Sequence, residues 1–200
     1  MRRLVSFAVV ALLTLTACTR TGDWPQFRNG PTSQGHNTQE TILSPSNVAA
    51  LGVVWTGPMG WAHFSSPAVA DGVVYVGSTD HKLYAYAVGC SSGGGTCTPL
   101  WTATTGNQIS SSPAVADGVV YVGSEDDKLY AFAVGCSTGG GTCTPLWTAT
   151  TGDQISHSSP AVADGVVYVG SGNGKLYAFA VGCSSGGGSC TPLWTATTGG

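Results

Sequence analysis

The sequence has few charged residues. They make up 8% of its 200 residues, against roughly a quarter in an average soluble protein. Lysine and arginine do not cluster anywhere, so no stretch suits a phosphate backbone and nucleic-acid binding is not expected. Without the first seventeen residues, five basic and ten acidic residues remain, which is a net charge of −5.

The sequence also lacks helical periodicity after about residue 20. Glycine is abundant instead, with 30 of 200 residues, about double the usual share. Valine, serine, threonine and alanine are frequent, and turn-forming pairs recur at regular intervals. This composition predicts an all-β fold.

Motifs for catalysis are missing as well. There is no G-x-S-x-G, and the four histidines have no H-x-x-x-H spacing; they are His36, His63, His81 and His157. His63 and His157 occupy matching loops, where a ligand contact is an alternative to an ordinary loop residue. Three aspartates recur in Asp-Gly pairs and are interpreted as turn residues rather than as acids or bases; they are Asp71, Asp117 and Asp164. The acidic run 125–127 is interpreted as a solvated hairpin tip rather than a calcium site.

The N-terminus has the pattern of an export signal. Two arginines precede an apolar stretch, 4–16, that is too short for a membrane span. Leu15-Thr16-Ala17-Cys18 then resembles the bacterial lipobox, in which the cysteine receives a diacylglyceryl group. An ordinary secretory signal is the alternative, but Leu15 is not the small residue that its cleavage requires. We expect a signal peptide at 1–17 and lipidation of Cys18.

Most of the remaining chain is a tandem repeat. Residues 65–106 and 111–152 are identical at 38 of 42 positions, and 158–199 matches the second copy at 37 of 42. Each copy contains four strand patterns separated by turn signals, of which Asp71-Gly72 suits a two-residue hairpin. The second strand, 73–76, is apolar on both faces and therefore needs cover on both sides. Blades stacked around an axis provide that cover, so each copy is predicted to be one four-stranded antiparallel blade.

The repeat resembles that of the pyrroloquinoline-quinone (PQQ)-like β-propellers. The resemblance rests on S-S-P-A-V-A-D-G-V-V-Y-V-G-S, on K-L-Y-A-F-A and on the following L-W, and the segment 23–28, DWPQFR, is similar to the start of many such propellers. It implies a β-propeller of four-stranded antiparallel blades. A fourth-strand pattern around Trp55, 46 residues before Trp101, adds one strand to the three full blades. Closed propellers have four to eight blades, so we expect an incomplete propeller or a fragment, with 47–200 as the repeat domain.

Where the family has a short turn before Leu-Trp, this chain has C-x6-C around three glycines. Six cysteines thus form one pair per blade: Cys90 and Cys97, Cys136 and Cys143, and Cys183 and Cys190. The strands on either side of each pair are expected to be antiparallel neighbours, which brings the two residues within disulfide range. Export leads to an oxidising compartment. Three local disulfides are therefore expected. Zinc is the alternative, but it requires four ligands and closer spacing.

Near-identical blades do not supply the different groups that catalysis needs in one place. Quinone-dependent dehydrogenases of the family carry an adjacent Cys-Cys pair, a calcium site and a catalytic aspartate, and this chain has no Cys-Cys pair. The expectation is a non-catalytic exported lipoprotein without a cofactor, held to the membrane through Cys18 by segment 18–46. It would bind a protein partner at the cell envelope and would self-associate through open blade faces. A fragment of a quinoprotein dehydrogenase is the alternative.

Overall fold

The computed structural model describes residues 23–30, 34–38, 40–61, 64–184 and 186–198. Apart from two 3-10 turns, η1 (Phe27–Asn29) and η2 (Val48–Ala50), its regular structure is all β. The strands are β1 (Trp55–Thr56), β2 (Ala68–Ala70), β3 (Val73–Gly77), β4 (Lys82–Ala87), β5 (Gly95–Thr96), β6 (Trp101–Thr104), β7 (Ala114–Ala116), β8 (Val119–Ser124), β9 (Lys128–Ala133), β10 (Gly141–Cys143), β11 (Trp147–Thr150), β12 (Ala161–Ala163), β13 (Val166–Ser171), β14 (Lys175–Ala180), β15 (Gly188–Ser189) and β16 (Trp194–Thr197).

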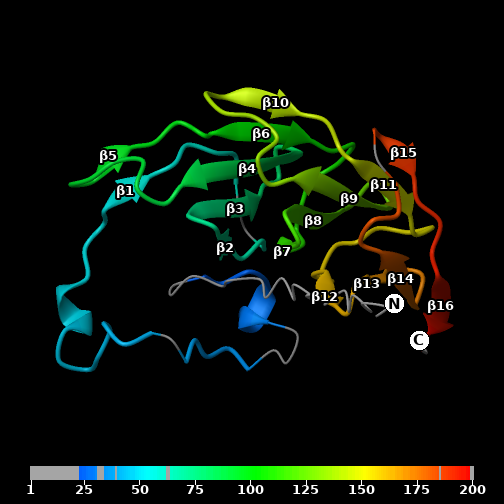
Figure 1. The fold of residues 1–200 in the computed structure, drawn as a ribbon, viewed down its shortest axis with the longest axis horizontal. Coiled ribbons are helices and arrows are strands. Elements are labelled where there is room, and N and C mark those ends of the chain that lie inside the picture. Colours follow the sequence, from blue (N-terminus) through cyan, green and yellow to red (C-terminus); the bar gives the residue numbers. More distant parts are fainter. Residues whose placement is uncertain (1–22, 31–33, 39, 62–63, 185, 199–200) are drawn as a thin grey trace, which may run out of the picture.

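The three repeats form three antiparallel meanders of four strands each. Blade one is β2-β3-β4-β6, blade two is β7-β8-β9-β11 and blade three is β12-β13-β14-β16. Figure 1 shows the blades side by side in chain order, with the N-terminal segment running beneath them. This arrangement confirms the predicted incomplete propeller of three full blades plus one extra strand.

The first hairpin of each blade turns through the predicted Asp-Gly pair. Asp71 and Gly72 have φ of 53° and 76°, and both equivalent pairs are also left-handed. Aspartate tolerates this region, and glycine adopts it without a Cβ clash. The second hairpin of blade three differs from the first. Only Gly174 of its Asn173-Gly174 pair is left-handed.

The innermost strands lie next to one another and are joined through the Ser-Ser-Pro motif. The backbone N–H of Ser66 donates to Ser112 Oγ at 2.9 Å, and that of Ser112 donates to Ser159 Oγ at 3.1 Å. The other serine of each pair acts within its own blade, as where Ser111 Oγ accepts from the Gly123 N–H at 3.2 Å. The motif therefore joins neighbouring blades in addition to starting a strand.

The segment after the expected anchor contacts all three blades. Trp24 and Val69 of β2 exchange two backbone hydrogen bonds of 2.7 and 2.8 Å. In blade two, the Val115 N–H donates to the Pro25 carbonyl at 2.7 Å. In blade three, the Val162 N–H donates to Gln26 Oε1 at 3.1 Å. Three consecutive residues thus connect the inner strands of the whole array.

The hydrophobic core lies between blades. One cluster joins blades one and two around Trp101, Ile109 and Phe132, and a second joins blades two and three around Trp147, Ile155 and Phe179. Neighbouring blades therefore bury each other's apolar faces, as expected for stacked repeats.

Candidate binding surface

The outer tryptophan of one blade binds the blade that follows. Trp101 Nε1 donates to the Val134 carbonyl at 3.1 Å, and Trp147 Nε1 donates to the Val181 carbonyl at 3.3 Å. Both indoles are 1% exposed. Because a buried indole N–H needs an acceptor, this bond fixes where the next blade can lie.

The C-x6-C loop forms a second link between blades, which the sequence analysis missed. Instead of an open loop, the glycine-rich segment forms a short strand that pairs in parallel with the outer strand of the preceding blade. Thus β10 pairs with β6 and β15 with β11. The N–H of Gly140 donates to the Leu100 carbonyl at 2.8 Å, and that of Gly187 donates to the Leu146 carbonyl at 2.8 Å.

The predicted cysteine pairs are joined in the structure. Their Cα atoms lie 5.7, 5.9 and 5.8 Å apart in blades one, two and three. All three bridges are local to one blade, so each closes the loop that carries the interblade strand. The described residues hold no cluster of three or more histidine, cysteine or acidic side chains that would suit a metal ion.

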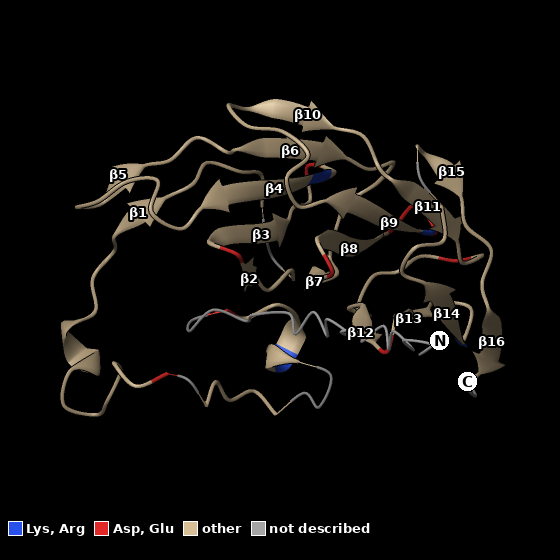
Figure 2. Cartoon of the chain, in the orientation of Figure 1, with Lys and Arg blue, Asp and Glu red and all other residues tan. Residues whose placement is uncertain are grey.

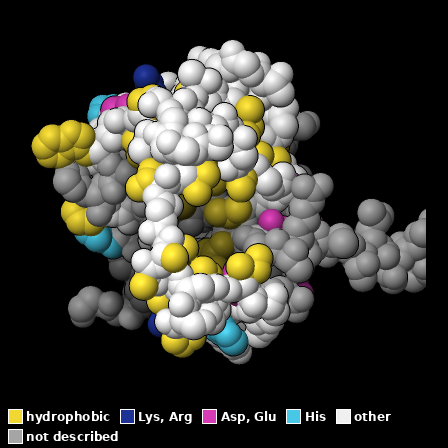
Figure 3. Space-filling model, turned by 90° about the vertical axis from the view of Figure 1, so that its left-hand side faces the viewer, with side chains coloured by type: hydrophobic (Ala, Val, Ile, Leu, Met, Phe, Trp, Pro, Cys, Tyr) yellow, Lys and Arg dark blue, Asp and Glu magenta, His cyan; other side chains and the backbone are white. Residues whose placement is uncertain are grey.

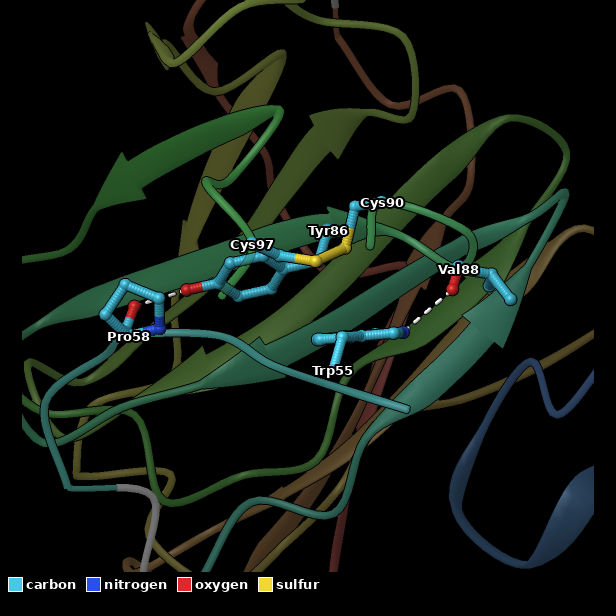
Figure 4. Close-up of a disulfide and its surroundings, with 6 residues drawn as sticks. All are labelled: Trp55, Pro58, Tyr86, Val88, Cys90 and Cys97. Carbon is cyan, nitrogen blue, oxygen red and sulfur yellow. Dashed lines mark hydrogen bonds between the residues drawn. A yellow bond between two sulfur atoms is a disulfide. The ribbon is translucent and has the colours of Figure 1, made fainter. Parts of the chain in front are cut away.

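The extra strand covers the first face of blade one, as Figure 4 shows. Trp55 of β1 donates from Nε1 to the Val88 carbonyl at 2.8 Å, and β1 pairs in parallel with β5. The Tyr86 hydroxyl donates to the Pro58 carbonyl, and Val76, Tyr84 and Tyr86 are buried. Our expectation of open blade faces is therefore wrong for blade one. Residues 55–59 take the place of a preceding blade.

The opposite face, on blade three, is open. Leu193 is 58% exposed and Trp194 is 45% exposed, whereas their counterparts in blade two are partly or fully buried. All four residues of β16 are exposed, and among the described residues this strand pairs only with β14. Within the described part of the chain, blade three thus presents an unpaired outer sheet edge and an exposed indole.

A cavity of about 330 Å³ lies near the inner strands. Its lining includes Gln26, Phe64, Ser112, His157 and Ser159. The rings of Phe64 and His157 meet edge-on at 5.9 Å. His157, one of the candidate ligand histidines, therefore lies at the cavity, whereas its counterpart His63 lies outside the described residues.

Tyrosine–carboxylate pairs close the second hairpins of blades one and two. The Tyr84 hydroxyl donates to Asp80 Oδ2, and that of Tyr130 donates to Asp126 Oδ2, each at 2.5 Å. Burial and the carboxylate neighbour raise the pKa of Tyr84 to about 12. Partial burial raises the pKa of Asp80, but hydrogen bonds from Tyr84 and Ser78 outweigh it, so that the net shift is downward. These pairs stiffen hairpin tips, and blade three has Asn173 at this position.

The other candidate residues have turn or surface roles. Glu125 accepts hydrogen bonds from Gln108 Nε2 at 2.5 Å and Ser110 Oγ at 2.7 Å, so it braces its own loop. His81 occupies a left-handed turn position, with φ of 67°. Cys18 lies outside the described residues. Among those that are described, no helix has the length and apolar character needed to cross a membrane.

Charge does not dominate any surface of the described chain. Figure 2 shows that the lysine and arginine positions are few and well separated, and that the aspartate and glutamate positions lie mostly at turns. The end of the molecule next to β1 carries several separate groups of hydrophobic side chains (Figure 3).

Comparisons with solved structures identify the fold. Two quinohemoprotein alcohol dehydrogenases align over 88% of this chain: ADHIIG from Pseudomonas putida HK5, with 20% identity and a TM-score of 0.66, and the enzyme from Comamonas testosteroni, with 19% identity and a TM-score of 0.65. A europium-containing methanol dehydrogenase aligns over 88% with 18% identity and a TM-score of 0.65. The aligned parts are 26%, 27% and 32% of those proteins, so this chain spans about a quarter to a third of their lengths.

A search of curated protein sequences returns no significant match. A family model does match, over residues 46–182, and its description is outer membrane protein assembly factor BamB. That stretch covers more than two thirds of the chain and includes β1, blades one and two and most of blade three. The chain therefore belongs to this family of PQQ-like β-propeller repeat proteins.

Proposed function

We propose that this protein is a non-catalytic binding module of the bacterial cell envelope, exported and anchored by lipid at Cys18. The observation that carries the proposal is the outer edge of blade three, where β16 has no outer neighbour among the described residues. Unpaired strand edges recruit further strands, and strand addition combines backbone hydrogen bonds with side-chain pockets for specificity. The half-exposed Trp194 is the residue type that most often dominates the energy of protein interfaces.

Family membership supports this assignment. The matching family model is named for an assembly factor of outer-membrane proteins, which is a role performed by binding other proteins. The chain's own features agree with an envelope location, since a lipobox-like sequence precedes the repeats and each blade carries a cysteine pair suited to an oxidising compartment.

The alternative is that the chain is part of a quinone-dependent dehydrogenase. PQQ carries three carboxylates, which a binding site neutralises with basic side chains. The described lining of the cavity near the inner strands includes neither lysine nor arginine, and Trp24, Pro25 and Gln26 bond to the inner strands nearby. That cavity therefore lacks the basic side chains that the cofactor needs, which favours the binding function.

The anchor is tested by fractionation. Cys18→Ser should release the protein from the membrane fraction or leave its precursor uncleaved, because the lipid is attached through the thiol. Serine replacement of both Cys183 and Cys190 is the control, since it removes two cysteines without touching the signal. Unchanged processing and membrane association of the Cys18 variant would contradict lipidation.

The binding role is tested in cells with a photoactivatable residue at Thr195, on the exposed edge of β16. We expect covalent adducts to protein, and fewer adducts when Trp194→Glu is added. The same residue placed at Thr41, in the N-terminal segment, is the control for chance contact. A titration of the purified chain with PQQ tests the alternative, and saturable stoichiometric binding would favour the dehydrogenase reading.

A further inference from the structure

The glycine-rich strands at the two internal junctions are held to the preceding blade by few contacts. β10 and β15 lie at the outer rim, beyond β6 and β11 (Figure 1). In segment 138–144 only Cys143 is buried, and in segment 186–191 only Cys190 is buried. Backbone hydrogen bonds and one small side chain therefore hold each strand in place.

Each of these loops passes through two consecutive glycines in the left-handed region. Gly139 and Gly140 have φ of 80° and 89°, and Gly186 and Gly187 have φ of 78° and 86°. Glycine adopts this region without a clash, but it also loses the most conformational freedom when it is ordered. The covalent link between the two cysteines removes part of that freedom in advance. The ordered loop, and with it the short strand, therefore depends on the disulfide.

The other contacts at each junction do not involve the loop. Trp147 Nε1 donates to the Val181 carbonyl, and the Ser112 N–H donates to Ser159 Oγ. The clusters at the two junctions also pack aromatic side chains of neighbouring blades together. A blade can therefore lose its outer rim strand and remain stacked on its neighbour.

The two cysteines of each bridge differ in burial. Cys136 and Cys183, the first of each pair, are partly exposed, whereas Cys143 and Cys190 are each 4% exposed. A disulfide exchanges when a thiolate attacks one of its sulfur atoms, and access helps to decide which sulfur is attacked. An incoming thiolate therefore reaches the first cysteine of each pair.

We propose that the disulfides at the two internal junctions are exchange sites for a dithiol oxidoreductase, and that their reduction releases β10 and β15 from the outer rim. A thiolate of the reductant attacks Cys136 Sγ and forms a mixed disulfide, while Cys143 leaves as a thiolate and takes up a proton. The second thiol of the reductant then attacks the mixed disulfide, which frees Cys136 and leaves the reductant oxidised. Cys183 and Cys190 react in the same way.

Reduction changes what the outer rim offers to other molecules. The carbonyls of Leu100 and Leu146 lose their donors, which are the N–H groups of Gly140 and Gly187. The outer edges of β6 and β11 then have no partner strand, and such edges recruit further strands. The inference rests on the proposed export, because the oxidising compartment forms the disulfides, and it is independent of the partner of blade three.

The first experiment follows amide exchange in the full chain, purified in its oxidised form in a mild detergent and then treated with dithiothreitol without denaturant. The amides of Gly140 and Gly187 should exchange about tenfold faster or more after reduction, because the loop that holds them opens locally. Amides of β8 and β9 should keep their protection. Unchanged exchange at both glycines would overturn the proposal. Equal loss of protection in β8 and β9, or disulfides that are reduced only in denaturant, would also overturn it.

The second experiment uses each loop as the control for the other. Serine replacement of both Cys136 and Cys143 should speed exchange at Gly140 without reductant and leave Gly187 protected. The equivalent double variant in blade three should show the reverse. Loss of protection at both glycines in either variant would mean that the disulfide stabilises the whole array, which contradicts a local latch. If a variant does not fold, reduction of the parent chain still decides.

The third experiment identifies the attacked sulfur. A thioredoxin-class oxidoreductase whose second active-site cysteine is replaced by serine cannot complete the second step, so the mixed disulfide accumulates. Peptide mapping without reductant should place it on Cys136 and Cys183. Adducts on Cys143 or Cys190, or no adduct at all, would overturn the exchange site. Since the starting material is the purified oxidised chain, these outcomes do not depend on anchoring or on the binding role, which fractionation and cross-linking test separately.

Discussion

Blades two and three are identical at 37 of 42 positions, but their outer strands lie in different environments. Trp147 is 1% exposed because blade three covers it, and Trp194 is 45% exposed because no described residue covers it in the same way. Burial here depends on the neighbour more than on the residue itself. In a stacked array, stability is a sum of repeat and interface contributions, and an uncovered interface remains available for binding.

Truncation of the outer tryptophan should give the largest difference between the two blades. Trp147→Ala should lower the free energy of unfolding by about 3–5 kcal/mol, as for other buried aromatic truncations. Trp194→Ala should cost about 1–2 kcal/mol, because part of its surface is already in water. Denaturant titration at a concentration too low for assembly measures both. Equal losses would show that blade three is covered in solution.

Loss of a disulfide should affect the two blades equally. Replacing Cys136 and Cys143 with serine should cost about 2.5 kcal/mol by the chain-entropy relation for an eight-residue loop. The Cys183 and Cys190 double variant should lose a similar amount, since β10 and β15 both lie against a four-residue strand. Denaturant titration gives the cost, and peptide mapping without reductant checks the pairing. Free thiols or bridges between blades in the exported protein would contradict the assignment.

The repeat, the blade order, the Asp-Gly hairpins and the cysteine pairs could all be predicted from sequence because each leaves a local pattern of residue types. The pairing of the glycine-rich loop with the preceding blade could not, because its hydrogen bonds come from backbone groups that every residue has. The role of Trp24–Gln26 was equally hidden, since these residues bond to strands up to 136 positions away. The cover on blade one depends on where residues 55–59 fold back, which no periodicity indicates.

Replacing the equivalent glycine in the second strand of blades two and three should give a smaller difference in stability between them. A Cβ added at Gly123 would lie 2.2 Å from Ile155 Cγ2, and one added at Gly170 would come no closer than 3.2 Å to Ser158 Oγ. Gly123→Ala should therefore cost about 1–2 kcal/mol from overpacking, and Gly170→Ala should stay within about 0.5 kcal/mol of the parent. Thermal unfolding of both variants checks this. A neutral Gly123 variant would mean that Ile155 moves freely.

The smallest effect on stability is expected at the second hairpin tip. Asp126→Asn gives blade two the residue that blade three has, where Asn173 Nδ2 donates to the Tyr177 hydroxyl at 2.8 Å. Because blade three accommodates an amide at this position, Asp126→Asn should lower the free energy of unfolding by less than about 1 kcal/mol at neutral pH.

The clearest effect of Asp126→Asn should be on the titration of Tyr130. Burial raises the pKa of Tyr130, and the Asp126 carboxylate raises it further. A phenol whose folded pKa lies above the unfolded value of about 10 stabilises the fold below that pH, and this stabilisation is lost as the pH rises toward the folded pKa. Asp126→Asn removes the carboxylate but not the burial, so the pKa of Tyr130 should fall while staying above its ordinary value. Ultraviolet absorbance of the phenolate follows the titration, with Tyr130→Phe used to assign the signal. If the midpoint of the Tyr130 titration does not move in Asp126→Asn, burial alone accounts for the raised pKa of Tyr130. The Asp126 carboxylate and an amide at that position would then be electrostatically equivalent.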